Sequence, residues 1–279
     1  MRKNMNWMVL SGLLLIGAPM AHATDGFSIG TGANYSSGKY GTATTTDIWS
    51  VPFTAAYQAD RWTFKVTVPY ISIHGAGNVI PGTGPVNNTN PLGRSLGNPL
   101  GGGSNQGSGS TSTTTASTSA SGLGDVVASA GYTLFSSADR SFGLDLTGKV
   151  KFGTADVNKG LGTGQNDYGL SLDSYKVLGQ WTPFGGVGWM SYGSSQYIKL
   201  KNGINANAGV DYRVASNDHV GMYYNYRQRI AVGGAPQSEV AAYWNHKFSD
   251  SFRLQSYALG GMANGSPDYG VGASINYTF

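Results

Sequence analysis

Apolar and polar residues alternate along much of the chain. In the last segment one parity carries aromatic or apolar side chains and the other carries polar side chains or glycine: Tyr269, Val271, Ala273, Ile275, Tyr277 and Phe279 against Asp268, Gly270, Gly272, Ser274, Asn276 and Thr278. The same division recurs over 141–152 and 204–214. A period of two residues predicts β-strands that have one apolar face.

The length of these segments decides between a soluble and a membrane protein. A soluble sandwich also alternates, but its strands usually have about five or six residues, whereas a tilted strand needs about ten to cross a bilayer. The segments here extend over ten or more residues. We therefore expect an all-β fold: one transmembrane antiparallel up-and-down β-barrel of about 12 strands. The segments lie at 25–36, 43–58, 61–73, 122–135, 141–153, 165–178, 180–193, 201–215, 218–230, 238–249, 251–262 and 267–279.

The connections between the segments alternate in length. Short links at 58–61, 136–140, 179, 216–217 and 250 alternate with longer ones at 37–42, 74–121, 154–164, 194–200, 231–237 and 263–266. Outer-membrane barrels have short periplasmic turns and long extracellular loops. The order therefore predicts periplasmic termini, whereas a sandwich gives no reason for connections to sort in this way.

Aromatic residues cluster toward both ends of the predicted strands. Such girdles lie at the two membrane interfaces, whereas the aromatic residues of a sandwich core would concentrate in mid-strand. The predicted periplasmic girdle contains Trp62, Phe64, Phe142, Trp181, Phe248, Phe252, Tyr277 and Phe279, and the other contains Tyr35, Trp49, Tyr168, Trp189 and Tyr269. The terminal Phe279 resembles the C-terminal signal of outer-membrane barrels, so we expect the barrel-assembly machinery as a partner.

The composition excludes several other classes of protein. The chain has 279 residues, of which 11% are charged, and a mean hydropathy of −0.20, which is too polar for a bundle of membrane helices. Its 12% aromatic residues argue against a disordered chain. The absence of Cys excludes a disulfide framework, a thiolate metal site and a Cys nucleophile.

The first residues predict an export signal. Arg2 and Lys3 precede an apolar run over 7–18, and Ala21-His22-Ala23 follows as a small-x-small site, so we expect cleavage after Ala23. The apolar run is too short for a membrane helix, which needs about twenty residues. Without Arg2 and Lys3 the formal charge falls from +4 to +2, and no long basic run remains to bind nucleic acid.

The link at 74–121 is unusual in length and composition. Residues 101–122 form a Gly/Ser/Thr tract for which we expect no fixed structure, only a flexible extracellular loop. The earlier part, 74–85, contains two prolines and the apolar pair Val79-Ile80. Two interpretations of it remain open: a constriction folded into the barrel mouth, and a cap on the rim.

Three short motifs resemble one family of outer-membrane proteins. They are Phe64-Lys65-Val66-Thr67-Val68-Pro69-Tyr70, Gly122-Leu123-Gly124-Asp125, and Lys151-Phe152-Gly153 with 160–164 and Asp167-Tyr168. In this order they resemble the transporter-like family named for the MetA pathway of phenol degradation. The resemblance implies a channel-like barrel of twelve strands that takes up aromatic compounds. From their types, the motif residues are structural, with glycines for close strand approach and Pro69 at a bulge or bend.

The inward parity carries most of the remaining charges. Near the outer mouth it places Asp125, Lys149, Lys151, Asp167, Arg227, Arg229, Glu239 and Asp268. Near the periplasmic end it places Lys65, Asp145, Asp211, Arg213, Lys247 and Arg253. Either these charges pair across a narrow lumen, or they form a weakly anion-favouring path in which Tyr223, Tyr243 and Tyr257 offer ring faces and hydroxyls.

Two classes of function follow. The first is passage of small solutes, including the aromatic or hydrophobic compounds that the resemblance implies; a structural or adhesive barrel is its alternative. The second is an outer-membrane lipid hydrolase, which needs a Ser beside a His with an orienting Asn or Asp. His74, His219 and His246 show no His-x-Ser pattern, so we expect no catalytic residues, no metal and no cofactor.

Overall fold

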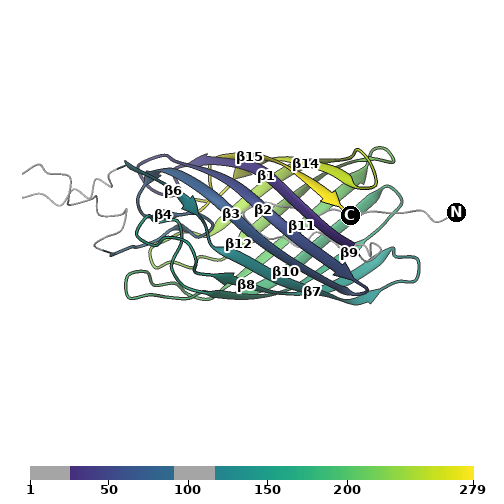
Figure 1. Cartoon of the computed structure of the whole chain (residues 1–279). Helices are drawn as coiled ribbons and strands as arrows, with labels where there is room; N and C mark the ends of the chain where they lie inside the picture. The colour runs from purple at the N-terminus through teal and green to yellow at the C-terminus, as the bar shows by residue number, and fades with distance from the viewer. Residues whose placement is uncertain (1–25, 91–116) are drawn as a thin grey trace, which may run out of the picture.

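The computed structural model describes residues 26–90 and 117–279, and the predicted signal over 1–23 lies outside them. Thirteen strands form one antiparallel sheet, which closes because β2 pairs with both β1 and β3 (Figure 1). β6 and β7 follow one another along β3, so the barrel wall has twelve positions, as predicted. The strands are β1 (Gly26–Gly38), β2 (Thr46–Ala59), β3 (Trp62–Ala76), β6 (Ser117–Leu123), β7 (Val126–Ser136), β8 (Phe142–Phe152), β9 (Asp167–Lys176), β10 (Trp181–Ser191), β11 (Gly203–Arg213), β12 (Asp218–Arg227), β13 (Gln237–Lys247), β14 (Phe252–Gly261) and β15 (Tyr269–Thr278).

The two ends of the barrel differ as the sequence predicts. The links at 60–61, 137–141, 177–180, 214–217 and 248–251 lie at one end, which we call the turn end, and the longer links lie at the loop end. Ser28 pairs with Thr278, so both terminal strands meet at the turn end. The described ranges contain no helix that is long and apolar enough to cross a membrane.

A β-bulge lies between β6 and β7, which both pair with β3. Tyr70 pairs with Leu123 and Thr67 pairs with Val127, so Val68 and Pro69 face three residues, 124–126. The Gly124 amide donates to the carbonyl oxygen of Pro69 at 2.8 Å. An extra residue reverses the strand parity, so Leu123 points outward while Asp125, two positions later, points inward. This is the bulge or bend expected at Pro69.

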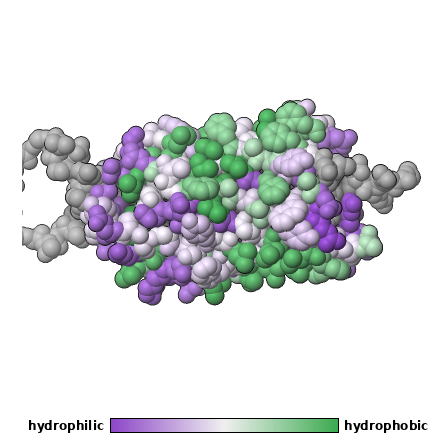
Figure 2. Space-filling model, turned by 60° about the horizontal axis from the view of Figure 1, so that its bottom comes forward, coloured by the Kyte–Doolittle hydropathy of each residue, from purple (hydrophilic) through white to green (hydrophobic). Residues whose placement is uncertain are grey.

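The outer surface is apolar over the middle of the barrel. In Figure 2 hydrophobic side chains spread over that part of the visible face and hydrophilic ones gather toward the ends. Both predicted girdles are present as ring contacts. The ring centroids of Trp181 and Tyr212 lie 4.5 Å apart at the turn end, and those of Tyr35 and Trp49 lie 4.9 Å apart at the loop end. The alternation therefore separates an apolar outer face from an inner face that carries the charges.

Glycine allows aromatic rings to lie against the inner wall. Each of four inward rings covers a glycine that is its register partner on the next strand: Tyr175 on Gly143, Phe184 on Gly209, Tyr243 on Gly221 and Tyr257 on Gly272. A Cβ atom at these glycines would lie 2.3–2.5 Å from a ring atom, which is too close. The pairs explain part of the high glycine content and hold the rings within the barrel interior.

Residues 77–90, the mouth segment, fold into the loop end. The segment contains the short hairpin β4 (Val79–Ile80) and β5 (Gly84–Pro85). Val79 is fully buried in one apolar cluster with the inner wall residues Ile48, Ile71 and Ile73. Ile80 is buried in a second cluster with Ile198, Leu200 and Ile230 from the neighbouring loops. Of the two interpretations of 74–85, the packing of Val79 and Ile80 agrees with a segment folded into the barrel mouth.

The expectation for the Gly/Ser/Thr tract was wrong over 117–122. These residues belong to β6, which pairs with β3 from Ser117 opposite Ala76 to Leu123 opposite Tyr70. The tract contains no apolar alternation, and the backbone pairing to an extended β3 imposes the strand instead. Residues 101–116 lie outside the described ranges.

Candidate functional site

Most of the predicted lumen residues lie on the inner face of the barrel. Two do not: Arg229 and Asp268 lie beyond the ends of β12 and β15 and are exposed at the loop end. The inward set comprises Lys65, Asp125, Asp145, Lys149, Lys151, Asp167, Asp211, Arg213, Tyr223, Arg227, Glu239, Tyr243, Lys247, Arg253 and Tyr257. The structure divides this set into several separate groups.

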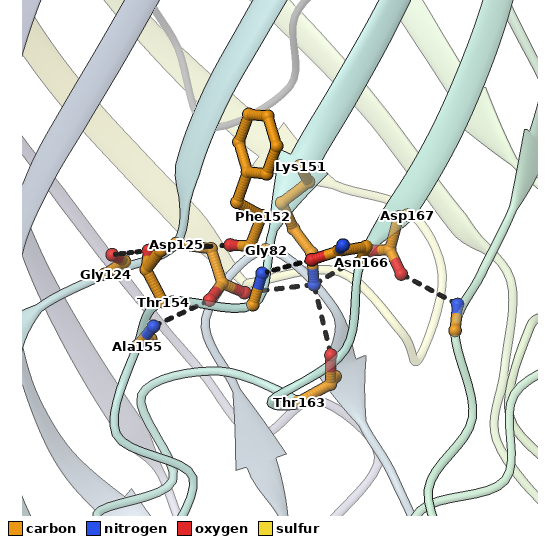
Figure 3. A network of polar contacts seen from close by, with 12 residues as sticks. Gly82, Gly124, Asp125, Lys151, Phe152, Thr154, Ala155, Thr163, Asn166 and Asp167 are labelled. Atoms are coloured by element: carbon orange, nitrogen blue, oxygen red, sulfur yellow. Dashed lines mark hydrogen bonds and ion pairs between the residues drawn. The ribbon is translucent and has the colours of Figure 1, made fainter.

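Lys151 is the centre of an ionic network near the loop end (Figure 3). Its ammonium lies 3.0 Å from Asp125 and 2.9 Å from Asp167, and it donates to the Thr163 hydroxyl at 3.1 Å. Asp167 is only 2% exposed, so its charge requires this partner. Here the inward charges pair with one another.

The same network anchors the long loops. Asp125 accepts from the Ala155 amide and Asp167 from the Gly193 amide, both at 2.9 Å. A Cβ at Gly162 would lie 2.8 Å from the Asp125 carboxylate, so only glycine fits this approach. Residues from two of the sequence motifs thus meet in one network, in which their role is structural.

Three further inward acids, Asp145, Asp173 and Asp211, are buried on the wall closer to the turn end. Asp145 accepts from the Thr133 hydroxyl at 2.6 Å, and Asp211 accepts from Tyr243 at 3.0 Å and contacts His219 at 2.7 Å. Asp173 is the direct cross-strand partner of Asp145 and accepts from Ser171 at 2.9 Å. Asp173 is not among the residues predicted for the lumen, although it has the same parity as Asp167 and that parity would have identified it.

Arg227 attaches the mouth segment to the wall. Its Nη1 donates to the carbonyl oxygen of Gly82 at 2.7 Å and its Nη2 to that of Thr83 at 2.5 Å. On the next strand, Gln237 donates to the Gly265 carbonyl oxygen at 3.1 Å. A Cβ on Gly84 would lie 3.2 Å from Gln237, so the segment lies close to two strands of the wall.

A cavity of about 80 Å³ lies beside the mouth segment. Its lining combines aromatic rings with hydrogen-bonding groups from the loop after β1 and from one side of the wall, including Tyr40, Tyr223, Tyr257, Asn34, Gln237 and Glu239. Glu239 is 5% exposed and Tyr223 is 7% exposed. Burial raises the pKa of Tyr40, in the loop at 39–45, to about 12, so its hydroxyl stays neutral at physiological pH. Such a lining suits a small solute that has apolar and polar parts.

The turn end is predominantly basic on its inner face. Lys247 is the register partner of Arg253, and its ammonium lies 2.5 Å from Asp250 in the adjacent turn. This ion pair lowers the pKa of Asp250. Arg213 donates to the Gly179 carbonyl oxygen at 3.3 Å. These contacts hold the cationic side chains of Lys247, Arg253 and Arg213 at the turn end.

One serine–histidine contact bears on the hydrolase interpretation. The His74 Nδ1 lies 2.6 Å from the Ser119 hydroxyl on the outer face, where both residues are exposed. Asp47 is the register partner of His74 but accepts from the Tyr35 hydroxyl, and no carboxylate within the described residues bonds to His74. The contact thus lacks the orienting acid of a serine hydrolase. Ser119 lies in a serine-rich tract, so no sequence signal distinguished it.

Comparison with known proteins shows the fold. No family model and no curated protein sequence matches the chain. An outer membrane channel from Pseudomonas putida F1 has a TM-score of 0.62 at 15% identity, covering 92% of this chain and 97% of its own. The NanC porin has a TM-score of 0.53 at 9% identity, with 90% and 100% covered, and the β domain of the Bordetella autotransporter BrkA has 0.52 at 11%, with 92% and 100% covered. The barrel therefore has the fold of bacterial outer-membrane proteins.

No group of acids and histidines in 26–90 or 117–279 could hold a metal ion.

Proposed function

We propose that the chain is an outer-membrane channel for small solutes, narrowed at its loop end by the mouth segment. The cavity between this segment and the wall carries the proposal, because it gives a solute a site inside the barrel. The Pseudomonas putida F1 protein, whose structure is similar over 92% of the chain, is itself an outer membrane channel, which supports this function.

We further propose aromatic or hydrophobic compounds as the solutes. The resemblance to the family named for phenol degradation supports this class, and so do the rings of Tyr223 and Tyr257 in the cavity. The loop end would face the medium and the turn end the periplasm. Signal cleavage after Ala23 and insertion by the barrel-assembly machinery through Phe279 complete the proposed route to the membrane.

The test is conductance in planar bilayers together with uptake of aromatic compounds by cells that carry the protein. Replacement of Tyr223 by Leu should lower uptake, whereas replacement of the adjacent Tyr224, which is 40% exposed on the outer face, should not. Bilayers that stay silent with folded protein would contradict the channel and favour a structural or adhesive barrel. Equal uptake with and without the protein would contradict the solute class.

A further inference from the structure

Two lysines and a serine form one row on the inner wall. Lys65 on β3 is the register partner of Ser129 on β7, and Ser129 is the register partner of Lys149 on β8. All three share the inward parity of these strands. Adjacent strands lie about 5 Å apart, so the two lysines originate about 10 Å from each other with a hydroxyl between them.

Neither ammonium is neutralised by a described residue. Within 26–90 and 117–279, Lys65 and Lys149 form no ion pair and no hydrogen bond, in contrast to Lys151 and Lys247. The charges of Arg227, Asp167 and Asp173 interact with the Lys149 ammonium only at longer range.

The neighbouring acids are engaged elsewhere. Asp167 is held by Lys151 and the Gly193 amide, and Asp173 by Ser171 and the Asn207 amide group. On either side of the lysine row the inner wall presents the hydroxyls of Thr67 toward the loop end, and of Thr63 and Thr147 toward the turn end. The row therefore consists of cations and hydroxyl groups without a carboxylate of its own.

A half-buried ammonium without a counter-charge is costly, and an anion beside it recovers that cost. A carboxylate has two oxygens, which can accept from two donors at once. We propose that Lys65, Ser129 and Lys149 bind the carboxylate of a solute in transit, so that the channel takes small organic acids. This inference rests on the proposed channel function and narrows the aromatic or hydrophobic solutes proposed above to those that carry a carboxylate.

Binding can be measured without conductance. The lysines would be dimethylated with ¹³C, which keeps their charge, and observed by NMR in detergent micelles during titration with sodium acetate. We expect saturable shifts for Lys65 and Lys149 and only linear drift for Lys39 and Lys201, which are exposed. Assignments come from Lys65→Arg and Lys149→Arg variants. Linear drift at all four positions would overturn the proposal.

Selectivity in planar bilayers provides the second measurement. Lys65→Gln and Lys149→Gln should each reduce the permeability ratio of acetate to sodium, and the pair should reduce it further, whereas Lys39→Gln should not change it. Lys65→Arg should retain the wild-type ratio, which shows that charge and not folding is responsible. An unchanged ratio in the double variant overturns the anion site. A silent bilayer contradicts the channel, and the titration still decides whether the row binds carboxylate.

Discussion

The guanidinium Nη1 of Arg227 donates a hydrogen bond of 2.7 Å to the carbonyl oxygen of Gly82. This contact joins the wall to the mouth segment, which is distant in the sequence. Because this segment lies within the loop end, a solute that enters the proposed channel must displace the segment or pass beside it.

Removing the Arg227 contact should loosen the mouth segment. A hydrogen bond to a charged group contributes about 1.5–3 kcal/mol, so Arg227→Ala should raise the population of the displaced segment by about tenfold or more. The expected result is larger single-channel conductance with more frequent switching. Arg229→Ala is the control, since Arg229 is exposed and lies beyond β12. Identical traces for both variants would show that the segment does not limit conduction.

The glycine beneath an inner ring should tolerate no side chain. A Cβ at Gly221 would lie 2.3 Å from the Tyr243 ring, and the ring is held by Asp211. Gly221→Ala should therefore destabilise the barrel by about 1–3 kcal/mol, as overpacking does. Gly260→Ala is the matched control, because a Cβ there meets nothing within 4 Å. Urea unfolding in detergent, followed by gel mobility, compares the two, and equal midpoints would contradict the packing role.

The stability of the barrel should depend on the Lys151 network being intact. Lys151→Met leaves Asp125 and Asp167 without their cation, and breaking a buried pair in this way costs about 3–5 kcal/mol. Adding Asp125→Asn and Asp167→Asn should recover part of the loss. Hydrogen exchange at the Ala155 and Gly193 amides reports the anchoring of the loops. The exposed Lys201→Met serves as the control, and a Lys151 variant as stable as this control would refute the network's role.

The boundary of β6 makes a deletion experiment sharp. Deleting 101–116 retains all the described strands and should leave the folded, heat-modifiable band on gels unchanged. Deleting 117–123 removes every register pair between β6 and β3 and should weaken or abolish that band. A folded band that persists in the second deletion would show that β6 is dispensable for the barrel.

The turn at 137–141 should respond to acid. Asp139 accepts from the Ser137 hydroxyl at 2.7 Å and the Ser141 amide at 3.0 Å, and these hydrogen bonds lower its pKa to about 2. Because the pKa lies below that of an unfolded Asp, about 3.9, the stabilisation is complete above pH 4 and declines as the pH falls toward 2. Amide exchange at Ser141 should accelerate over this interval in the wild type. In Asp139→Asn the rate relative to a free peptide should stay constant.

Strand parity predicted the barrel because one variable, the side a residue faces, controls burial throughout this fold. Lys149 and Lys151 illustrate this: their inward placement follows from counting residues, and the structure agrees. Partners could not be predicted, since whether Lys151 contacts Asp167 and Lys149 contacts no acid of the described ranges depends on register and loop paths that leave no local pattern.

Two positions show where counting fails. Arg229 has the same parity as Arg227, but the strand ends at Arg227, so parity no longer applies to it. Ser119 lies in a tract without alternation and becomes a strand residue only because β3 extends far enough to pair with it. In both cases the length of the neighbouring elements, and not the residue itself, determines the outcome.

The pairs of rings and glycines separate two properties of the barrel that could be engineered independently. Each ring rests on a neighbouring backbone, so it adds aromatic surface with little intrusion toward the axis. Between the mouth segment and the turn end, the bore is then determined by the number of strands, and the affinity of the wall for a solute by a few exchangeable rings. A scaffold of this kind can acquire a different specificity by single substitutions while its architecture stays constant.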